Sequence, residues 1–591
     1  MNVRVNLNYP IYDGAEIVFK APCDASEVTG LIVYYPGGVD MFSFADAHTN
    51  DLGHIDELFA AGAVVKVILD TDAKMAFVQN AVTNAYLEKK FSAVGGSTEH
   101  YYESLYQAIV DINSGAYDHS IADVSAAKVK VFNSNSGVLT VALLGDITES
   151  VNITVSKSLQ LVLAGHNLTF TNDGFLTFAE GTDCSIDGSI TGSAIVRHLN
   201  LPSTNAYLVR IDCKTMYIKG GTYSLSGESK VLPVAFRIGS DNTCCEVDGC
   251  EIILTNSSLT TSTTTRAVQS QSAKLILRGT TITTSCETTS TAAAAFVDSV
   301  GIVSGSCEIE NCSISSRGCC VYAVNKITAT SADITIRDSN IGAVSTQDGG
   351  FAIAVLNHSS ATTSIENSYI FADARGDDTG EEVSRGIANQ GTLYIKNSDV
   401  IATYAAVHNH GKLYVNGGSY KGYSHGGFYF THGANGIAYI NDATIMCGGY
   451  EGEYADVFAG DTVEVLGGFY VGGTGNALGS NMSIYIDGCT IDGSAGSTGF
   501  VLRNTYDEAN NTVYISNSNV SGIVRIDDGT HSLQVGIGTN ITDGGINNPA
   551  YAEFTNELYR NQHEDYQLTG KDLSAIVSYI KSVPSGDEVS Y

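Results

Sequence analysis

The sequence predicts an all-β fold, a right-handed parallel β-helix in which a single chain winds into stacked rungs. Three observations support this prediction. An eight-residue pattern recurs between residues 184 and 520, its copies are about one solenoid coil apart, and one of its positions holds only Gly, Asn or Asp. Segments without the pattern flank the repeats, and we expect them to cap the ends of the solenoid.

The pattern runs through an apolar, a variable, an apolar and a variable residue, then a turn residue, a small residue, a variable residue and an apolar residue. Alternation along a strand points the first and third residues inward and the second outward. Successive copies are 20 to 32 residues apart, which suits one coil of a β-solenoid. The copies begin at residues 184, 216, 245, 275, 307, 334, 363, 393, 413, 438, 463, 484 and 513.

The fifth position of the pattern predicts a sharp corner between two short strands. Gly, Asn and Asp are the residues that best tolerate the left-handed backbone conformation that such a corner requires. The residues at this position are Gly188, Gly220, Gly249, Gly279, Asn311, Asp338, Asn367, Asn397, Gly417, Asp442, Gly467, Gly488 and Asn517.

Four asparagines predict a second regular column. Asn325, Asn357, Asn389 and Asn409 precede consecutive copies of the pattern. Stacked Asn side chains can hydrogen-bond to one another along a solenoid, so we expect a structural ladder.

The sequence outside the repeats divides into smaller parts. Short β runs predict strands from residues 3, 16, 31, 64 and 75, with a hairpin turn at Thr71 and a short helix from His54. An amphipathic segment from Glu99 predicts a capping helix, and a capping-box-like start at Thr569 predicts a helix running to about Ile580. The expected domains are a small β-rich N-terminal domain at 1–91, a capping helix and linker at 92–132, the β-helix at 133–530, and a C-terminal cap or assembly segment at 531–591.

Composition limits the partners of the chain. The formal net charge of -32 repels nucleic acids and anionic membranes, so a neutral polysaccharide or another protein is the expected partner. We see no signal peptide and no apolar run of membrane-spanning length. The 13 Cys include no CxxC pair, so we expect reduced, mostly buried thiols and synthesis in a reducing cytoplasm.

Two resemblances add to these observations. The stretch LLGDITESVNITVSKSLQLVLAGHNLTF from Leu143, with copies such as GIANQGTLYIKNSDV from Gly386, resembles the pectin-lyase-like β-helix superfamily. That superfamily includes lyases, hydrolases, tailspikes and non-catalytic adhesins, so the resemblance implies a fold and not an activity. Segments of residues 1–91 such as NLNYPIYDGAEIVFKAPCDASEVTGLIVYYP resemble N-terminal regions of tail proteins from phages and prophages of gut bacteria. This second resemblance implies attachment to a phage tail or baseplate, location in the virion, and a homotrimer.

The outward second position of the pattern gives the candidate binding residues. It becomes almost uniformly Tyr in the last copies, where Glu464 is the one exception. A stripe of phenolic rings could contact sugars, could be buried between subunits of a trimer, or could simply stabilise the sheet. The candidate glycan-binding residues are Tyr394, Tyr414, Tyr439, Tyr485 and Tyr514.

Catalysis of glycoside hydrolysis would need two suitably spaced carboxylates, and two acidic segments between repeat copies could provide them. We also considered the clustered His408, His410, His425 and His432 as metal ligands, but variable rung positions explain them better. No nucleotide, P-loop, GxSxG or HExxH motif occurs, so we expect no cofactor and no metal. The candidate catalytic residues are Asp377, Asp378, Glu381, Glu382, Glu451, Glu453 and Asp456.

The sequence therefore predicts a tail fibre or tailspike-like protein that binds a host surface glycan without cleaving it. The alternatives are a polysaccharide depolymerase, either hydrolase or lyase, on the same β-helix, and a non-viral β-helix adhesin.

Overall fold

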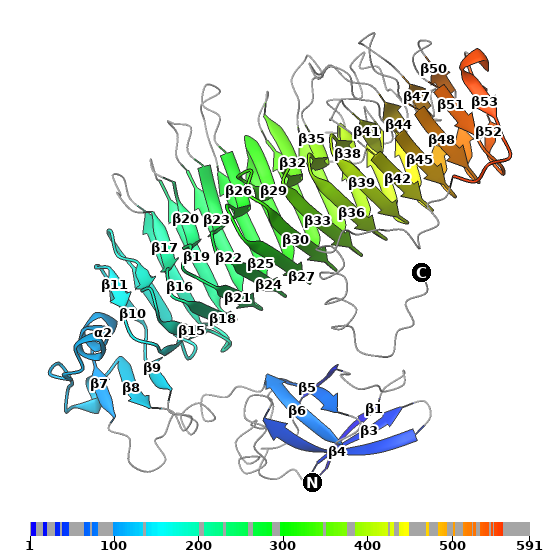
Figure 1. Cartoon of the computed structure of the whole chain (residues 1–591). Helices are drawn as coiled ribbons and strands as arrows, with labels where there is room; N and C mark the ends of the chain where they lie inside the picture. Colours follow the sequence, from blue (N-terminus) through cyan, green and yellow to red (C-terminus); the bar gives the residue numbers. More distant parts are fainter. Residues whose placement is uncertain are drawn as a thin grey trace. The chain divides into compact units, whose positions relative to one another are not determined.

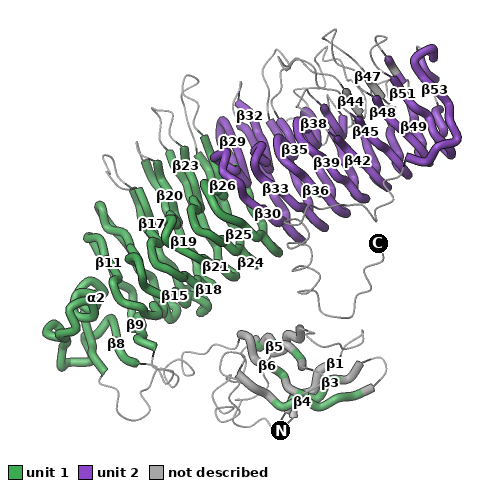
Figure 2. Tube along the Cα trace, in the orientation of Figure 1, with its two compact units in different colours: residues 1–316 green, residues 317–591 purple. Residues whose placement is uncertain are grey.

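The structure is a computed structural model and divides into two compact units, residues 1–316 and 317–591 (Figure 2). Regular structure in the described residues is almost entirely β-strand. The described residues are 2–6, 16–20, 30–35, 38–46, 64–70, 74–80, 99–133, 138–199, 206–228, 232–257, 264–286, 296–346, 350–374, 384–422, 426–430, 437–447, 469–471, 483–492, 500–502, 512–522, 524–526, 532–542, 545–547 and 549–559.

The N-terminal strands form a six-stranded sheet with the order β1-β3-β4-β6-β5-β2. β5 and β6 pair antiparallel on either side of the hairpin turn predicted at Thr71. The prediction missed β4, and the helix predicted from His54 lies outside the described residues. The strands are β1 (Asn2–Asn6), β2 (Glu16–Lys20), β3 (Gly30–Tyr35), β4 (Gly38–Asp46), β5 (Val64–Asp70) and β6 (Met75–Asn80).

The remaining strands form a right-handed parallel β-helix, which confirms the predicted fold (Figure 1). Each rung contributes one strand to each of three parallel sheets. Sheet 1 holds the first half of the eight-residue pattern, sheet 2 follows the corner, and sheet 3 closes the coil. Apolar residues that point inward from all three sheets form the core.

In the first unit, sheet 1 begins with two antiparallel pairings, β7 with β8 and β8 with β9, and is parallel from β9 onward. Strand β28 spans the boundary between the two units. Sheet 1 contains β7 (His100–Tyr102), β8 (Val129–Asn133), β9 (Leu139–Leu143), β12 (Gln160–Val162), β15 (Asp183–Asp187), β18 (Thr215–Lys219), β21 (Cys244–Asp248), β24 (Lys274–Arg278) and β27 (Ser306–Glu310). Sheet 2 contains β10 (Ile147–Glu149), β13 (Asn167–Phe170), β16 (Ala194–Leu199), β19 (Thr222–Gly227), β22 (Glu251–Asn256), β25 (Thr281–Cys286) and β28 (Ser313–Gly318). Sheet 3 contains β11 (Ile153–Val155), β14 (Leu176–Phe178), β17 (Tyr207–Ile211), β20 (Val234–Ile238), β23 (Thr264–Ser270) and β26 (Phe296–Ile302).

The second unit repeats the three-sheet arrangement. A short 3-10 helix, Pro549–Tyr551, precedes its last strand. Sheet 1 contains β30 (Ala332–Arg337), β33 (Ala361–Glu366), β36 (Thr392–Lys396), β39 (Lys412–Asn416), β42 (Ile437–Asn441), β45 (Ser483–Asp487), β48 (Thr512–Ser516), β51 (Ser532–Val535) and β53 (Ala552–Phe554). Sheet 2 contains β31 (Asn340–Ser345), β34 (Tyr369–Ala374), β37 (Asp399–Ala402), β40 (Ser419–Gly422), β43 (Thr444–Cys447), β46 (Thr490–Asp492), β49 (Asn519–Ser521) and β52 (Asn540–Thr542). Sheet 3 contains β29 (Cys320–Lys326), β32 (Phe351–Asn357), β35 (Ser384–Asn389), β38 (Ala405–Asn409), β41 (Phe428–Phe430), β44 (Phe469–Val471), β47 (Phe500–Leu502) and β50 (Val524–Ile526).

A helix covers the first rung. The segment predicted as helical from Glu99 forms β7 first, and helix α2 (Leu105–Ser114) begins after the N-cap Ser104. α2 packs against β10 and β11. The backbone N–H of Tyr106 donates to Glu149 of β10 at 3.1 Å, and the Asn113 amide donates to the Thr154 carbonyl of β11 at 2.7 Å. These bonds satisfy polar groups that an uncovered rung would leave open.

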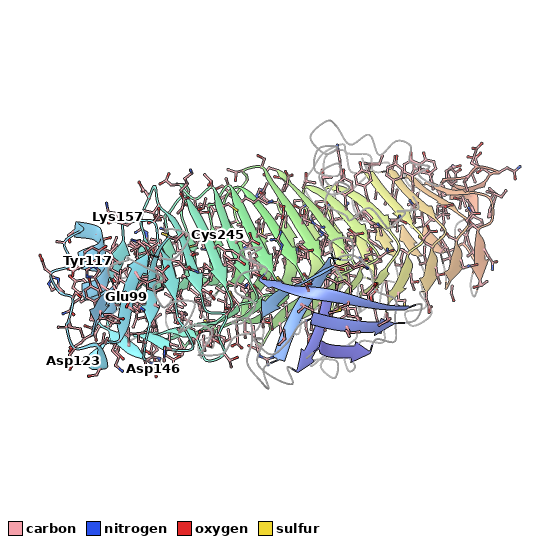
Figure 3. The ribbon with its side chains drawn as sticks, turned by 90° about the horizontal axis from the view of Figure 1, so that it is seen from below. Glu99, Tyr117, Asp123, Asp146, Lys157 and Cys245 are labelled. Atoms are coloured by element: carbon pink, nitrogen blue, oxygen red, sulfur yellow. The ribbon has the colours of Figure 1, made fainter. Side chains whose placement is uncertain are left out.

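A buried carboxylate closes the turn after α2. Asp111 accepts hydrogen bonds from the His119 backbone N–H at 2.8 Å and pairs with its ring Nδ1 at 2.5 Å. The Asp111 hydrogen bond raises the pKa of His119. Burial acts to raise the pKa of Asp111, but the hydrogen bonds from His119 lower it on balance. Glu99, Tyr117 and Asp123 lie in the same part of the chain (Figure 3).

The corner between sheets 1 and 2 has the left-handed backbone that the sequence predicts. The φ angle is between 46° and 73° at each described corner residue from Gly220 onward. Gly188 is the exception, because its φ lies outside the left-handed range, and Gly467 lies outside the described residues. The non-glycine corners with positive φ are Asn311, Asp338, Asn367, Asn397, Asp442 and Asn517.

The asparagine ladder forms in three of its four predicted positions. Asn357 donates to Asn389 at 2.7 Å, and Asn389 donates to Asn409 at 2.6 Å, all three being fully buried. Asn325 pairs in register with Leu356 and not with Asn357, so the ladder prediction is wrong at that position. The residue after it, Lys326, is fully buried and bonds through its ammonium to Thr328 and Thr330 at 3.0 Å.

Charges alternate in sign along the last strand position of sheet 1. In the first unit the register runs Asp187, Lys219, Asp248, Arg278, Glu310, and in the second it runs Arg337, Glu366, Lys396. Arg278 pairs with Glu310 at 3.3 Å, and Lys396 pairs with Glu366 at 3.0 Å. Exposed cross-strand pairs of opposite charge are modestly stabilising.

The cysteines whose side chains the structure describes carry free thiols, and all of them except Cys244 are buried. Burial raises the pKa of the fully buried Cys245 and Cys307 thiols well above the ordinary value, so these thiols stay protonated and unreactive.

Candidate functional site

The predicted tyrosines form one continuous ladder on the outer face of sheet 1. Backbone register aligns all five in consecutive rungs, from β36 to β48. The ring centroids of neighbours are 4.6 to 5.9 Å apart, and their planes are inclined by 7° to 16°. We call Tyr394, Tyr414, Tyr439, Tyr485 and Tyr514 the tyrosine ladder.

The ladder is continuous because one predicted rung does not exist. The pattern copy at residue 463 would place Glu464 between Tyr439 and Tyr485, but β42 pairs directly with β45. The end of that copy forms β44, which belongs to sheet 3 and pairs with β41 and β47. Glu464 itself lies outside the described residues. The prediction of thirteen stacked copies is therefore wrong at residue 463.

A sixth ring closes the ladder at its C-terminal end. Tyr559 lies over Tyr514 with ring centroids 5.1 Å apart and planes inclined by 57°. Its backbone N–H donates to the Ser516 hydroxyl at 2.9 Å. Gly536 provides space, because a Cβ there would lie 2.8 Å from the Tyr559 ring. Sequence reasoning missed Tyr559, which follows the last strand and belongs to no copy of the pattern.

Stacking decides which part of each ring a ligand could reach. Tyr414, Tyr439 and Tyr485 each have a ring on both faces, so only their edges and hydroxyls face outward. All five rings are partly exposed. Burial, followed by the neighbouring tyrosines, raises the pKa of Tyr439 and Tyr485, which keeps both hydroxyls protonated and able to donate hydrogen bonds. A sugar therefore cannot stack on these internal faces.

The strand positions beside the ladder are mostly uncharged, in contrast to the net charge of -32. Only two Lys and one Asp occur among them, and Asp487 is fully buried. These positions hold Thr392, Lys412, Ile437, Ser483 and Thr512 on one side and Lys396, Asn416, Asn441, Asp487 and Ser516 on the other.

The candidate catalytic residues are not among those the structure describes. Asp377, Asp378, Glu381 and Glu382 fall in 375–383, and Glu451, Glu453 and Asp456 fall in 448–468. Both segments connect sheet 2 to sheet 3. Next to the first segment, Asp373 is fully buried at the end of β34.

Two of the four clustered histidines are described. His408 is buried on β38, its ring 4.3 Å from that of His410 and 4.6 Å from that of Tyr429. His425 and His432 lie outside the described residues. Within the described ranges, no three metal-ligating side chains of His, Cys, Asp or Glu come together.

Comparison with known families finds no family model that matches this sequence, and a search of curated proteins finds no significant match. Among the described helices, none is long and apolar enough to span a membrane. The fold therefore defines the class of the protein, a parallel β-helix with an outward-facing tyrosine ladder.

Proposed function

We propose that the protein is a receptor-binding protein of the tail fibre or tailspike type, and that its tyrosine ladder contacts a host surface glycan. The observation that supports this proposal is the unbroken stack from Tyr394 to Tyr514, whose hydroxyl edges face outward over five rungs. A stack that served the sheet alone would not need a hydroxyl in every rung.

The geometry favours an extended polymer. Ring spacings of 4.6 to 5.9 Å place one phenolic group in each rung along the solenoid. Each phenol can donate and accept a hydrogen bond, which suits the hydroxyls of a polysaccharide that lies along the ladder. The few charges beside the ladder keep electrostatic repulsion of an acidic glycan small at this surface.

The other functional assignments also belong to this proposal. Residues 1–91 would attach the protein to a phage tail or baseplate, and the protein would be made in the bacterial cytoplasm and act in the virion. A homotrimer is the expected assembly for a tailspike. Cleavage of the glycan is not part of the proposal, since no geometry of the described residues supports it.

The test removes hydroxyls without removing rings. The double variant Tyr439→Phe, Tyr485→Phe keeps the stack, and we expect its retention on immobilised host polysaccharide to fall about tenfold, from one to two lost hydrogen bonds. Tyr217→Phe, at the same strand position in the first unit, is the matched control.

Unchanged retention by the double variant would contradict the glycan proposal. If light scattering instead shows that Tyr439→Ser breaks an oligomer into monomers, then the ladder is a subunit interface and not a glycan surface.

A further inference from the structure

The outer face of sheet 3 in the first unit carries a polar column without a carboxylate. Backbone register aligns Thr177, Arg210, Arg237 and Gln269 in consecutive rungs. Like charges directly opposite each other destabilise a sheet, so two neighbouring arginines need an explanation. The net charge of -32 makes such a pair more unusual still.

The two arginines differ in their partners. Arg210 pairs with Asp212, with 2.6 Å between Nε and Oδ2. In the described part of the chain, Arg237 has no carboxylate within ion-pair distance; its guanidinium lies 5.6 Å from the centre of the Tyr207 ring. An arginine on an aromatic face keeps the edge of its planar fork available.

The aromatic platform under Arg237 is held from inside the solenoid. Arg197 is fully buried, and its Nη1 and Nη2 donate to the carbonyls of Tyr207 and Asn172. The Tyr207 ring packs edge-to-face on Phe175, with centroids 5.8 Å apart. Burial lowers the pKa of Arg197 to about 10, so it is still charged at neutral pH. A buried cation is costly, and this one fixes the residue on which Arg237 rests.

The next rung offers an unused acceptor. Gln269 Oε1 is buried and has no hydrogen-bond donor among the described residues. The residue in register beyond it is Gly301, which has no side chain to fill the space. A buried acceptor without a donor is unfavourable, so a rotation of the Gln269 side chain that brings Oε1 to a ligand donor would be favourable.

We propose that Arg237, with Arg210 beside it, binds the carboxylate or sulfate ester of an acidic sugar whose hydroxyl or amide donates to Gln269 Oε1. Guanidinium groups bind such anions through two parallel hydrogen bonds. The inference depends on the proposed function only for the ligand being a glycan. It also revises the expectation of a neutral polysaccharide, because the net charge does not describe this face.

Calorimetry on the whole 591-residue chain tests the site. The probes are a uronic-acid tetrasaccharide, the same tetrasaccharide with its carboxylates reduced, a sulfated tetrasaccharide and sodium sulfate. We expect at least one acidic tetrasaccharide to bind about tenfold or more tightly than the reduced one, and Arg237→Gln to remove this difference. Gln269→Leu should weaken binding several-fold without changing its dependence on salt, and Arg337→Gln, with the same loss of charge on sheet 1, should bind like the wild type.

Several results would overturn the proposal. These are no binding of either acidic tetrasaccharide, wild-type binding by Arg237→Gln, an equal loss in Arg337→Gln, or sodium sulfate binding as tightly as the sugars. Tyr439→Ser should keep the Arg237-dependent binding, so the site and the tyrosine ladder can fail independently.

Discussion

Tyr439 and Tyr485 stack with their ring centroids 4.8 Å apart and their planes inclined by 13°, although the long segment after Cys447 separates them in the sequence. Their strands pair directly, and the described residues between them form β43 in sheet 2 and β44 in sheet 3. This contact joins two shorter stacks of rings into one ladder.

Loss of an internal ring should destabilise the second unit. Tyr485→Ser removes two stacked contacts, each of which contributes about 0.5–1.5 kcal/mol beyond the buried area. We expect the free energy of unfolding to fall by about 1–3 kcal/mol, measured by urea denaturation. Tyr217→Ser is the control, because its register neighbours Ser185 and Glu246 are not aromatic. An equal effect of both substitutions would show that stacking adds nothing.

Substitution of an asparagine in the ladder should lower the free energy of unfolding more than substitution of a surface asparagine. Asn389 donates to Asn409 and to the Lys412 carbonyl, and it accepts from Asn357 and the Gly391 N–H. Asn389→Ala leaves these buried groups without partners, so we expect a loss of about 2–5 kcal/mol in unfolding free energy. Exposed Asn416→Ala should cost less than about 0.5 kcal/mol. A small effect at Asn389 would mean that water replaces its bonds.

The corner positions should tolerate glycine and not a β-branched residue, because their backbone is left-handed. Asn397 has a φ of 46°, a region that glycine adopts freely and β-branched residues avoid. Asn397→Gly should leave stability within about 1 kcal/mol of the wild type, and Asn397→Val should cost about 2 kcal/mol or more. Asp399→Val, in the extended strand β37 that follows the same corner, controls for the introduction of a β-branched residue. Thermal unfolding of the three variants gives the comparison.

The cap at α2 should depend on pH through His119 and Asp111. His119 has a raised pKa, so its contribution is full below the unfolded value of 6.5 and is lost as pH rises through the folded value. Asp111 has a lowered pKa, so its contribution is lost as pH falls through that value. The protection factors of the α2 amides, which remove the intrinsic pH dependence of amide exchange, should therefore be highest in mildly acidic solution.

Titration of the His119 ring by NMR checks the cause. The midpoint should lie above 6.5 in the wild type and return toward 6.5 in Asp111→Asn. A midpoint that Asp111→Asn does not change would show that the carboxylate is not responsible.

The sequence correctly predicted features that depend on residues within one rung. Its predictions were wrong where the structure depends on how the rungs pair with one another. Corner residues such as Asn397 are recognisable because a left-handed φ restricts the residue type locally. The copy at residue 463 satisfies the same local pattern, but its end forms β44 in sheet 3, and β42 pairs directly with β45 in sheet 1. Eight residues cannot fix the length of the connection from sheet 2 to sheet 3. The ladder prediction was wrong at Asn325 for a related reason, because the register there is shifted by one residue.

The candidate sites also divide into those that the repeat pattern predicts and those that it does not. The tyrosine ladder was predictable because the second position of the pattern sets both its face and its column. Tyr559 and the platform of Tyr207 and Arg197 were not, since they depend on contacts between residues that share no pattern. The acidic candidates from Asp377 to Asp456 stay predictions, because they lie outside the described residues.

The alternating charges on sheet 1 can disfavour incorrect pairing of rungs during folding. If the rung that carries Lys219 were left out of the stack, Asp187 would face Asp248, and an attractive contact would become a repulsive one. The correct and the incorrect charge pair differ by about 1 kcal/mol. This energy is small compared with the stability of the folded protein, but it favours the correct rung when similar rungs can pair with the same strand edge during folding. Omission of any single rung between Asp187 and Glu310 has this consequence. The rungs of Tyr414 and Tyr439 instead carry Asn416 and Asn441 at this position, so only the stacking of their rings would be interrupted by a missing rung.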